Sequence, residues 1–267
     1  KLGSQDLAGK TIGIAPGLGG VPLDDGVEAN LRASAERLAE TTGMRLVDID
    51  VNPPNLAALW MIGNLSTLLA ELGDRWPKCA DDLTDEIAIG LRLSESLYNL
   101  HTAAAAEKVR VEANDAMAHA FEAADFIVAA TNPGPAFPAD SPMSSANGGF
   151  IDWAKSNAVA KVGFRGAMGA LRVVGGAFPR LPTRLVDEVT ERFPEVVAMG
   201  GLTIISNIYG NPAVSIPSGQ IGGLPVGMQV LAPHHHDREL FDIALAAERE
   251  MPWPKVAPAV TLASTAG

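Results

Sequence analysis

The stretch Ile204–Gly219, IISNIYGNPAVSIPSG, together with Leu224–Pro233, LPVGMQVLAP, predicts more of the fold than any other part of the chain. It contains two short apolar runs, Ala213–Ile216 and Val226–Leu231. The pair Gly222-Gly223 lies between them. Two apolar runs around paired glycines are typical of a β-hairpin, so we expect two neighbouring antiparallel strands here.

Two prolines bracket the first of these runs. Pro212 precedes Ala213 and Pro217 follows Ile216. Because proline has no backbone N–H to donate to a neighbouring strand, we expect the hydrogen-bonded stretch of this strand to be short.

The N-terminal part of the chain predicts one strand–helix–strand unit. Thr11–Ala15 and Met44–Val51 have strand patterns, and the helix between them ends at Gly43. Asp24 or Asp25 is the expected N-cap of this helix. The expected core face of the helix is made of Val27, Leu31, Ala35 and Leu38. Such a unit favours a parallel pair of strands with a right-handed crossover.

The rest of the chain predicts one further strand, a long loop and several helices. Phe126–Ala130 is a short apolar run, which we interpret as a buried strand. The segment after it, Thr131–Gly149, is a long loop rich in Pro, Gly, Ser and Asn, and loops of that length are more often functional than idle. We expect helices over Leu56–Leu72, Asp85–Leu97, His101–Ala124, Asp152–Val162, Thr183–Phe193 and Asp237–Glu250, the last one capped by Asp237.

Composition limits the class of protein. The 267 residues are 47% hydrophobic, which is enough for a large core, and the net charge is −11 without any block of Lys or Arg. This charge disfavours nucleic acid as a partner, since such binding depends on basic side chains. The lone Cys79 allows no intrachain disulfide, and no apolar run reaches the roughly 18 residues that a membrane span requires. We therefore expect a soluble, cytoplasmic protein with no membrane partner.

Two motifs suggest ligands, but each has a simpler explanation. Gly17-Leu18-Gly19-Gly20 resembles the start of a dinucleotide-binding loop, yet Pro22 stands at the sixth position and the helix begins later. A turn that needs positive φ explains these glycines better. His234-His235-His236 could suggest a metal, but three adjacent histidines on a short turn cannot all face one ion. A solvated turn is the simpler reading, so we expect no metal site.

A third motif could be read as a nucleophile. Ser144 or Ser145 with Lys155 would form a Ser–Lys pair, but a catalytic serine also needs backbone donors for the oxyanion. The segment lacks the strand-to-helix elbow that would direct a serine, so a flexible or pocket-lining loop is the alternative.

The hairpin segment also resembles the C-terminal hallmark of the amidase-signature hydrolases, serine enzymes that cleave carboxamides with a Ser–cis-Ser–Lys triad. The similarity is most specific in Asn207–Gly219 with Leu224–Gly227. Weaker similarities to the same family occur, in the same order, at Leu7–Ile14, Gly26–Asp50, Glu122–Pro133 and Asp237–Pro258. The resemblance implies an α/β chain, part of the amidase-signature α/β/α fold with a mixed β-sheet flanked by helices. It also implies a helix over Thr203–Tyr209, although the composition of that segment is strand-like.

The family's catalytic residues have no counterpart in this sequence. The Gly/Ser-rich stretch G-S-S-G-G-S, which carries the family's nucleophile and cis serine, is absent from the 267 residues. No catalytic residue can therefore be assigned. We expect residues 1–10 to be a linker from a missing N-terminal catalytic half, residues 11–258 to be the C-terminal portion of the amidase-signature domain, and residues 259–267 to be a tail.

The resemblance also suggests a substrate pocket. The loop that begins at Thr131 is the main candidate, with Pro135 and Phe137 as apolar walls. Asn207 could hydrogen-bond backbone near that pocket, but bracing the turn before Pro212 is the better-supported role.

The implied function is part of an amidase that hydrolyses a carboxamide C–N bond through a serine acyl-enzyme. We expect this segment to contribute sheet and pocket and to be inactive alone. The implied partners are a small-molecule amide and an N-terminal amidase half in the same or another chain, with a homo-oligomer allowed and no cofactor. The alternative is a non-catalytic half-amidase that acts as a scaffold, or a subunit completed by a separate chain. A Gly/Tyr-rich, Arg-bearing segment found in the family's tRNA amidotransferase members is not present, which favours a general amide hydrolase.

Overall fold

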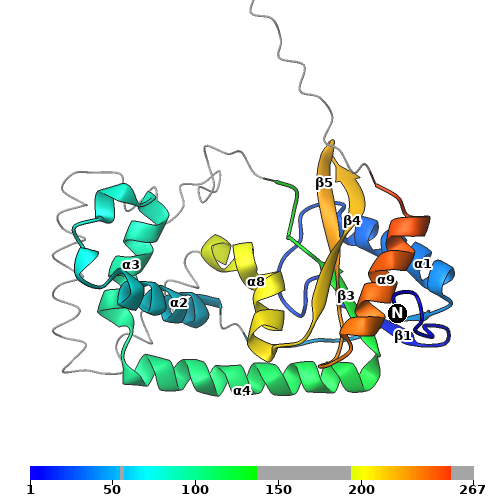
Figure 1. Ribbon diagram of the computed structural model, residues 1–267, viewed down its shortest axis with the longest axis horizontal. Helices are drawn as coiled ribbons and strands as arrows, with labels where there is room; N and C mark the ends of the chain where they lie inside the picture. The colour runs from blue at the N-terminus through cyan, green and yellow to red at the C-terminus, as the bar shows by residue number, and fades with distance from the viewer. Residues whose placement is uncertain (55–56, 137–193, 254–267) are drawn as a thin grey trace, which may run out of the picture.

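The computed structural model describes residues 1–54, 57–136 and 194–253 (Figure 1). The helices and strands follow the chain in this order: β1 (Thr11–Ile14), α1 (Val27–Thr42), β2 (Arg45–Asp48), α2 (Ala57–Leu72), η1 (Gly73–Arg75), η2 (Ala80–Asp82), α3 (Asp85–Leu97), α4 (Leu100–Ala123), β3 (Phe126–Ala130), α8 (Pro194–Tyr209), β4 (Ala213–Ile221), β5 (Leu224–Leu231) and α9 (Asp237–Glu250). The helices expected over Asp152–Val162 and Thr183–Phe193 lie outside the described residues.

The described strands form one mixed sheet. Their order is β2-β1-β3-β5-β4. The first three strands are parallel, while β5 is antiparallel to both β3 and β4. The expected α/β class with a mixed sheet is confirmed, and β2 and β4 are the end strands.

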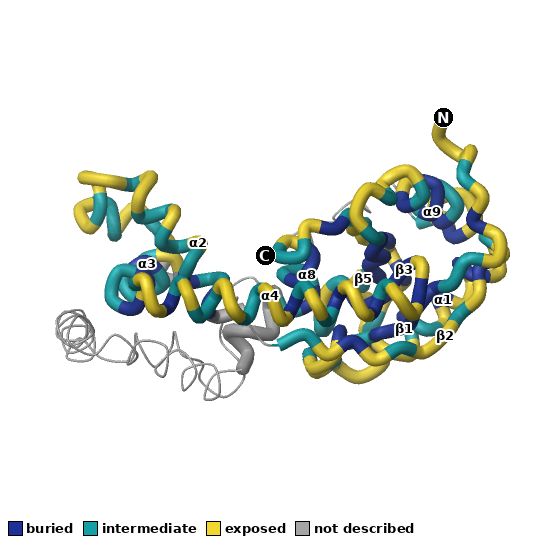
Figure 2. Tube along the Cα trace, turned by 90° about the horizontal axis from the view of Figure 1, so that it is seen from below, coloured by how far each residue is buried: buried dark blue, intermediate teal, exposed yellow. Residues whose placement is uncertain are grey.

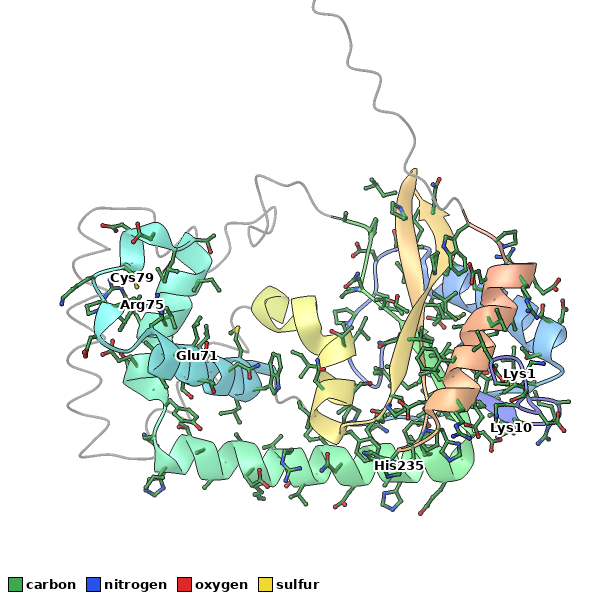
Figure 3. The ribbon with its side chains drawn as sticks, in the orientation of Figure 1. Lys1, Lys10, Glu71, Arg75, Cys79 and His235 are labelled. Atoms are coloured by element: carbon green, nitrogen blue, oxygen red, sulfur yellow. The ribbon has the colours of Figure 1, made fainter. Side chains whose placement is uncertain are left out.

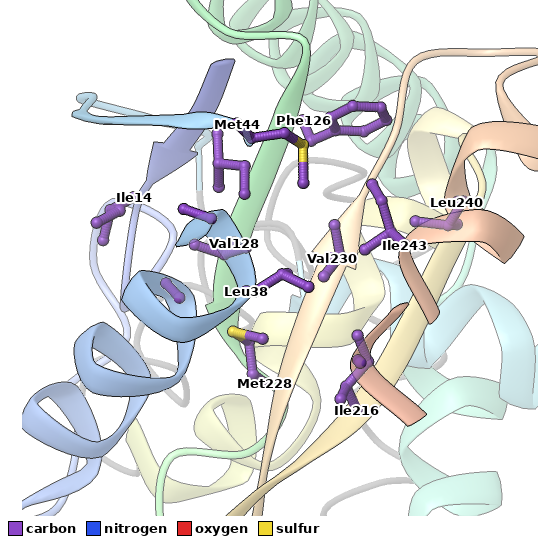
Figure 4. Packing of buried hydrophobic residues seen from close by; sticks show 14 of the residues in the cluster. Ile14, Leu38, Met44, Phe126, Val128, Ile216, Met228, Val230, Leu240 and Ile243 are labelled. Atoms are coloured by element: carbon purple, nitrogen blue, oxygen red, sulfur yellow. The ribbon is translucent and has the colours of Figure 1, made fainter. Parts of the chain in front are cut away.

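Helices cover both faces of this sheet (Figure 1). One apolar cluster joins the sheet to α1 and α9, and Figure 4 shows Phe126, Val128, Val230 and Ile243 packed together in it. A second cluster joins the opposite face to α4 and α8, through residues such as Met117, Leu202 and Ile205. The sheet therefore lies between two packed helix layers.

The first helix has the expected core face but not the expected cap. Val27, Leu31, Ala35 and Leu38 are buried, and Gly43 ends α1 in the left-handed conformation. The N-cap, however, is Gly26, also left-handed, and no side chain caps the helix. Asp24 and Asp25 belong instead to the loop before the helix, so the predicted cap was wrong. In the same way His236, and not Asp237, is the N-cap of α9.

The hairpin forms as predicted, but its first strand is longer than expected. β4 continues past Pro217 to Ile221, with a register shift between Pro217 and Gly219. Because β4 is an end strand and bulges there, a residue without an N–H does not interrupt a ladder on both sides. The connection is Gly222-Gly223, both at positive φ, as a two-residue hairpin turn requires.

The sequence from Thr203 to Tyr209 is helical, as the family resemblance implied, and forms the last part of α8. Its strand-like composition gives way because Leu202 and Ile205 pack on the sheet and bury the apolar face of the helix.

A helical arm, formed by α2 and α3, packs at the end of α4 that lies away from the sheet (Figures 1 and 2). Its buried apolar residues among those described are Leu59, Ile62, Leu91 and Leu97. Cys79, labelled in Figure 3, lies in this arm near Arg75 and remote from the sheet. None of the described helices is both long enough and apolar enough to cross a membrane.

Candidate functional site

Two loops meet where the parallel strands end. The loop after β1 and the loop after β3 are joined by a hydrogen bond from the backbone N–H of Asp24 to the carbonyl of Pro133, at 2.9 Å. The backbone of Ala130 also donates to the carbonyl of Pro16, at 3.0 Å. In open α/β sheets, ligands bind outside the carboxyl ends of the strands, so a ligand site is expected at this junction.

Two glycines allow close packing at this junction. A Cβ added to Gly134 would lie 1.9 Å from Oδ2 of Asp24, so a larger residue at position 134 would require the Asp24 side chain to move. On the other side, a Cβ at Gly201 of α8 would lie 2.9 Å from Cγ2 of Val21. Glycines therefore let both the β3 loop and α8 approach the loop after β1.

An open cavity of about 440 Å³ lies at this junction. Its walls are residues 16, 17, 21, 23–26 and 28. Asp24 and Asp25 are exposed carboxylates on its rim. The volume lies within the range of ligand pockets, roughly 300–1,000 Å³.

One of the acidic groups at the cavity is already paired. Glu28 accepts a hydrogen bond from Arg32 at 2.8 Å, and Asp48 accepts another from the same guanidinium at 2.7 Å. The hydrogen bond to Asp48 has the larger effect and the bond to Glu28 the smaller one, and together they hold the pKa of Arg32 above its ordinary value. No basic residue is among the described residues that line the cavity.

The glycine-rich turn after β1 serves the backbone. Leu18 and Gly19 both have positive φ, 43° and 80°, and a Cβ at Gly19 would lie 1.6 Å from the carbonyl oxygen of Val51. Helix α1 begins only at Val27. The arrangement agrees with a turn that needs positive φ, and it lacks the direct entry into a helix that a dinucleotide-binding loop requires.

A pair of hydroxyls marks the beginning of the candidate pocket loop. Oγ1 of Thr131, just after β3, lies 2.7 Å from Oγ of Ser215 on β4. The backbone N–H of Thr131 donates to the carbonyl of Gly227, at 2.9 Å. A Cβ at Gly227 would lie 2.9 Å from the Thr131 hydroxyl and 3.1 Å from the Ser215 hydroxyl, so glycine leaves room for the pair. The pair can donate to and accept from a polar ligand group.

The buried side chain of Gln229 connects the strands near this hydroxyl pair to α8. Its side chain is 3% exposed, and Nε2 donates to the carbonyl of Ala130 at 3.0 Å and to that of Leu202 at 2.8 Å. One amide thus ties β5 to the end of β3 and to α8. Burying an amide in this way is favourable only because its hydrogen bonds are made.

The predicted pocket residues fall in different places. Thr131 and Pro135 lie in the loop after β3, both half-buried. Asn207 is exposed near the far end of α8, and its Nδ2 contacts the carbonyl of Thr203 in the same helix, at 3.5 Å. Phe137 lies outside the described residues, as do Ser144, Ser145 and Lys155. The structure adds Ser215, Gln229 and Asp24, which sequence reasoning did not select.

The three consecutive histidines do not converge. His234 Nε2 lies 2.7 Å from the carbonyl of Tyr209, whereas His236 Nδ1 lies 3.2 Å from Glu239. His235, at positive φ between them, is drawn near the lower end of α9 in Figure 3. Among the residues that the structure describes, no group of three His, Cys, Asp or Glu side chains could hold a metal ion.

Sequence comparison finds local relatives. A segment of 82 residues is 34% identical to a glutamyl-tRNA(Gln) amidotransferase subunit of Clostridium kluyveri, and covers 30% of this chain and 17% of that protein. A segment of 46 residues is 50% identical to the corresponding subunit of Salinispora tropica, and covers 17% of this chain and 9% of that protein. No family model matches the chain.

Structural comparison covers far more of the chain. A bacterial aryl acylamidase of the amidase-signature family superimposes with a TM-score of 0.65 at 17% identity, over 93% of this chain and 45% of that one. The chain has the amidase-signature fold. The 6-aminohexanoate cyclic dimer hydrolase, with a TM-score of 0.61 at 16% identity, superimposes over 94% of this chain and 47% of its own. The amidase-signature resemblance is thus confirmed, and the chain spans about half the length of these amidase-signature structures.

Proposed function

We propose that this chain supplies the substrate pocket and part of the sheet of an amidase whose catalytic serine lies on a further half, in the same or another chain. The observation that carries the proposal is the junction at the carboxyl ends of β1 and β3. There Pro133 and Gly134 close on Asp24 beside the cavity, in a chain with the amidase-signature fold.

The proposed chemistry divides between the two halves. The other half provides the serine, which attacks the amide carbonyl, and the relay that takes its proton and delivers it to the departing amine. Water then cleaves the acyl-enzyme. This chain positions the substrate. The hydroxyls of Thr131 and Ser215 hydrogen-bond its polar groups. Val21, in the wall of the cavity, contacts its apolar part, and Pro135 of the loop after β3 adds a second apolar contact.

On this proposal the segment Lys1–Gly267 is catalytically silent by itself. Without a positioned nucleophile and oxyanion donors, binding alone gives little rate, since one oxyanion donor is worth about a hundredfold to a thousandfold. We also propose a cytoplasmic location and a small-molecule amide as substrate.

The test compares the native protein with the segment. An antibody to this segment is used to purify the native species, and its intact mass is measured. Hydrolysis of 4-nitroacetanilide and of small primary carboxamides is then followed for this species and for recombinant residues 1–267. We expect activity only in the native species. Activity of equal rate in residues 1–267 would overturn the division of labour.

A non-catalytic subunit is the second candidate. The local sequence relatives are subunits of an amidotransferase, which favours a chain that works inside an assembly. The same purified native species distinguishes the two: hydrolysis of a free amide supports the amidase, whereas a stable complex without amide hydrolysis supports the subunit.

A further inference from the structure

The charges around the cavity at the ends of β1 and β3 are all of one sign. Asp24, Asp25 and Glu28 line it, and none of the described lining residues is basic. Glu28 is paired with Arg32, at 2.8 Å. Neither Asp24 nor Asp25 forms an ion pair within the part of the chain that the structure describes. Two negative charges at the cavity are therefore not compensated by side chains.

The beginning of α1 opposes these charges only in part. Gly26 is the N-cap of the helix, and no side chain caps it. The aligned peptide dipoles of a helix place about +0.5 of an elementary charge at its N-terminus. This is smaller than the charge of two carboxylates, so the cavity favours a positive ligand group over a negative one.

Another part of the cavity wall is apolar. It is made by Pro16, Val21 and Leu23, all half-buried. The N–H of Val21 donates to the carbonyl of Gly17, at 3.0 Å, which holds this wall in place. An apolar wall beside exposed carboxylates suits a hydrocarbon group that ends in an ammonium. Such a ligand removes its apolar part from water and keeps its charge near the carboxylates.

The position of Asp24 connects this charge to the proposed substrate pocket. Its N–H donates to the carbonyl of Pro133, at 2.9 Å, in the loop after β3. Its Oδ2 lies 1.9 Å from the place that a Cβ would take at Gly134. The carboxylate is therefore next to the loop that we propose to contact the substrate.

We infer, building on the proposed function, that the substrates are amides that also carry a primary amine, and that Asp24 and Asp25 select them. The amine is protonated at neutral pH and is attracted by both carboxylates. A neutral substrate of the same shape lacks this attraction, and an anionic one is repelled, so the two aspartates set specificity as a difference between substrates.

The test measures kcat/KM of the native protein, produced in its source cells, for two pairs of anilides. N-(4-aminomethylphenyl)acetamide is compared with N-(4-ethylphenyl)acetamide, which places the charge on the amine side of the amide. β-Alanyl anilide is compared with butanoyl anilide, which places it on the acyl side. The variants Asp24→Asn and Asp25→Asn are made singly and together. Glu40→Gln, exposed at the other end of α1, is the matched control.

We expect the ammonium compound to be preferred by about three- to tenfold in at least one pair. The preference should approach one in the double variant, and also in about 1 M salt, where the Debye length is about 3 Å. It should persist in Glu40→Gln. Because the preference is a ratio within one protein, a change in the amount of folded protein cancels.

Equal rates within both pairs would overturn the inference and leave the proposed function intact. A preference that Glu40→Gln lowers as much as the aspartate variants do would also overturn it, since net charge and not the cavity would then be responsible. If the native protein hydrolyses neither these anilides nor small carboxamides, the proposed function fails and the inference fails with it.

Discussion

The sheet region and the helical arm are built on different scales. Strand β3 is buried along its whole length, and both faces of the sheet are covered by helices. Among the described residues, the arm of α2 and α3 buries Leu59, Ile62, Leu91 and Leu97, and much of the apolar surface of α2 is only half-buried. A region with a large core unfolds as a unit, whereas one with few buried contacts can open locally. The candidate site lies next to the region with the larger core.

The largest expected difference between the sheet and the arm is in how each responds to the loss of one large buried side chain. Phe126→Ala should lower the free energy of unfolding by about 3–5 kcal/mol, because it leaves a cavity at a fully buried strand. Leu97→Ala in the arm should instead open α2 and α3 locally while the sheet stays folded. Urea unfolding combined with hydrogen exchange distinguishes the two. Equal global losses would show that arm and sheet are one cooperative unit.

A second prediction concerns the brace beneath the site. Gln229→Leu should cost about 1–3 kcal/mol, because the carbonyls of Ala130 and Leu202 lose their shared donor in a buried place. Gln220→Leu, at an exposed position on β4, is the matched control and should change stability little. The midpoint of thermal unfolding measures both, and indistinguishable midpoints would contradict the role of Gln229.

The third prediction concerns pH and the attachment of the N-terminal segment. Burial alone would raise the pKa of Asp242 on α9, but hydrogen bonds from the backbone of Gly3, Gln5 and Ser4 outweigh it and hold the pKa below its ordinary value of 3.8. The bonds from Gly3 and Gln5 measure 2.5 and 2.8 Å.

A carboxyl whose pKa is lower when folded stabilises the protein above its ordinary pKa and loses that effect as pH falls through the lowered value. Asp242→Asn should therefore be less stable than the wild type at neutral pH, and the difference should shrink in acid below pH 3.8. Unfolding free energies across this range, with Asp6→Asn as an exposed control, check the sign. A difference that grows toward acid would refute it.

The smallest effect is expected at the surface. Arg32→Ala removes the contacts to Glu28 and Asp48, but these groups are well exposed, so the loss should stay below about 1 kcal/mol and decrease further with added salt. Arg37→Ala, at an exposed position on the same helix, is the control. A loss of several kcal/mol would mean that the β2 edge is stabilised by more than a screened ion pair.

Local patterns predict most of the described elements. The bounds of α3 and β3 agree with the sequence, and the hairpin forms around its two glycines, because helix periodicity and turn chemistry act over short distances. The sequence underestimates the length of β4, since tolerance of Pro217 depends on that strand lying at the end of the sheet. Only the topology shows this position.

The candidate site is predictable only in part. The sequence indicates Thr131 and its loop through length and composition. Its partner Ser215 is 84 residues away along the chain, and the carbonyl of Ala130 is 99 residues from Gln229. The sequence pattern favours Asp24 or Asp25 as a helix cap, because an acidic residue before a helix usually has that role. Its packing against Gly134 depends on the fold bringing two loops together.

The proposed function depends above all on a reactive serine that lies outside these 267 residues. The decisive measurement is labelling of the native protein in its source cells with a serine-reactive fluorophosphonate, followed by mapping of the modified peptide. We expect the labelled serine to belong to a segment absent from Lys1–Gly267. Stoichiometric labelling of Ser144 or Ser145 would contradict the proposal.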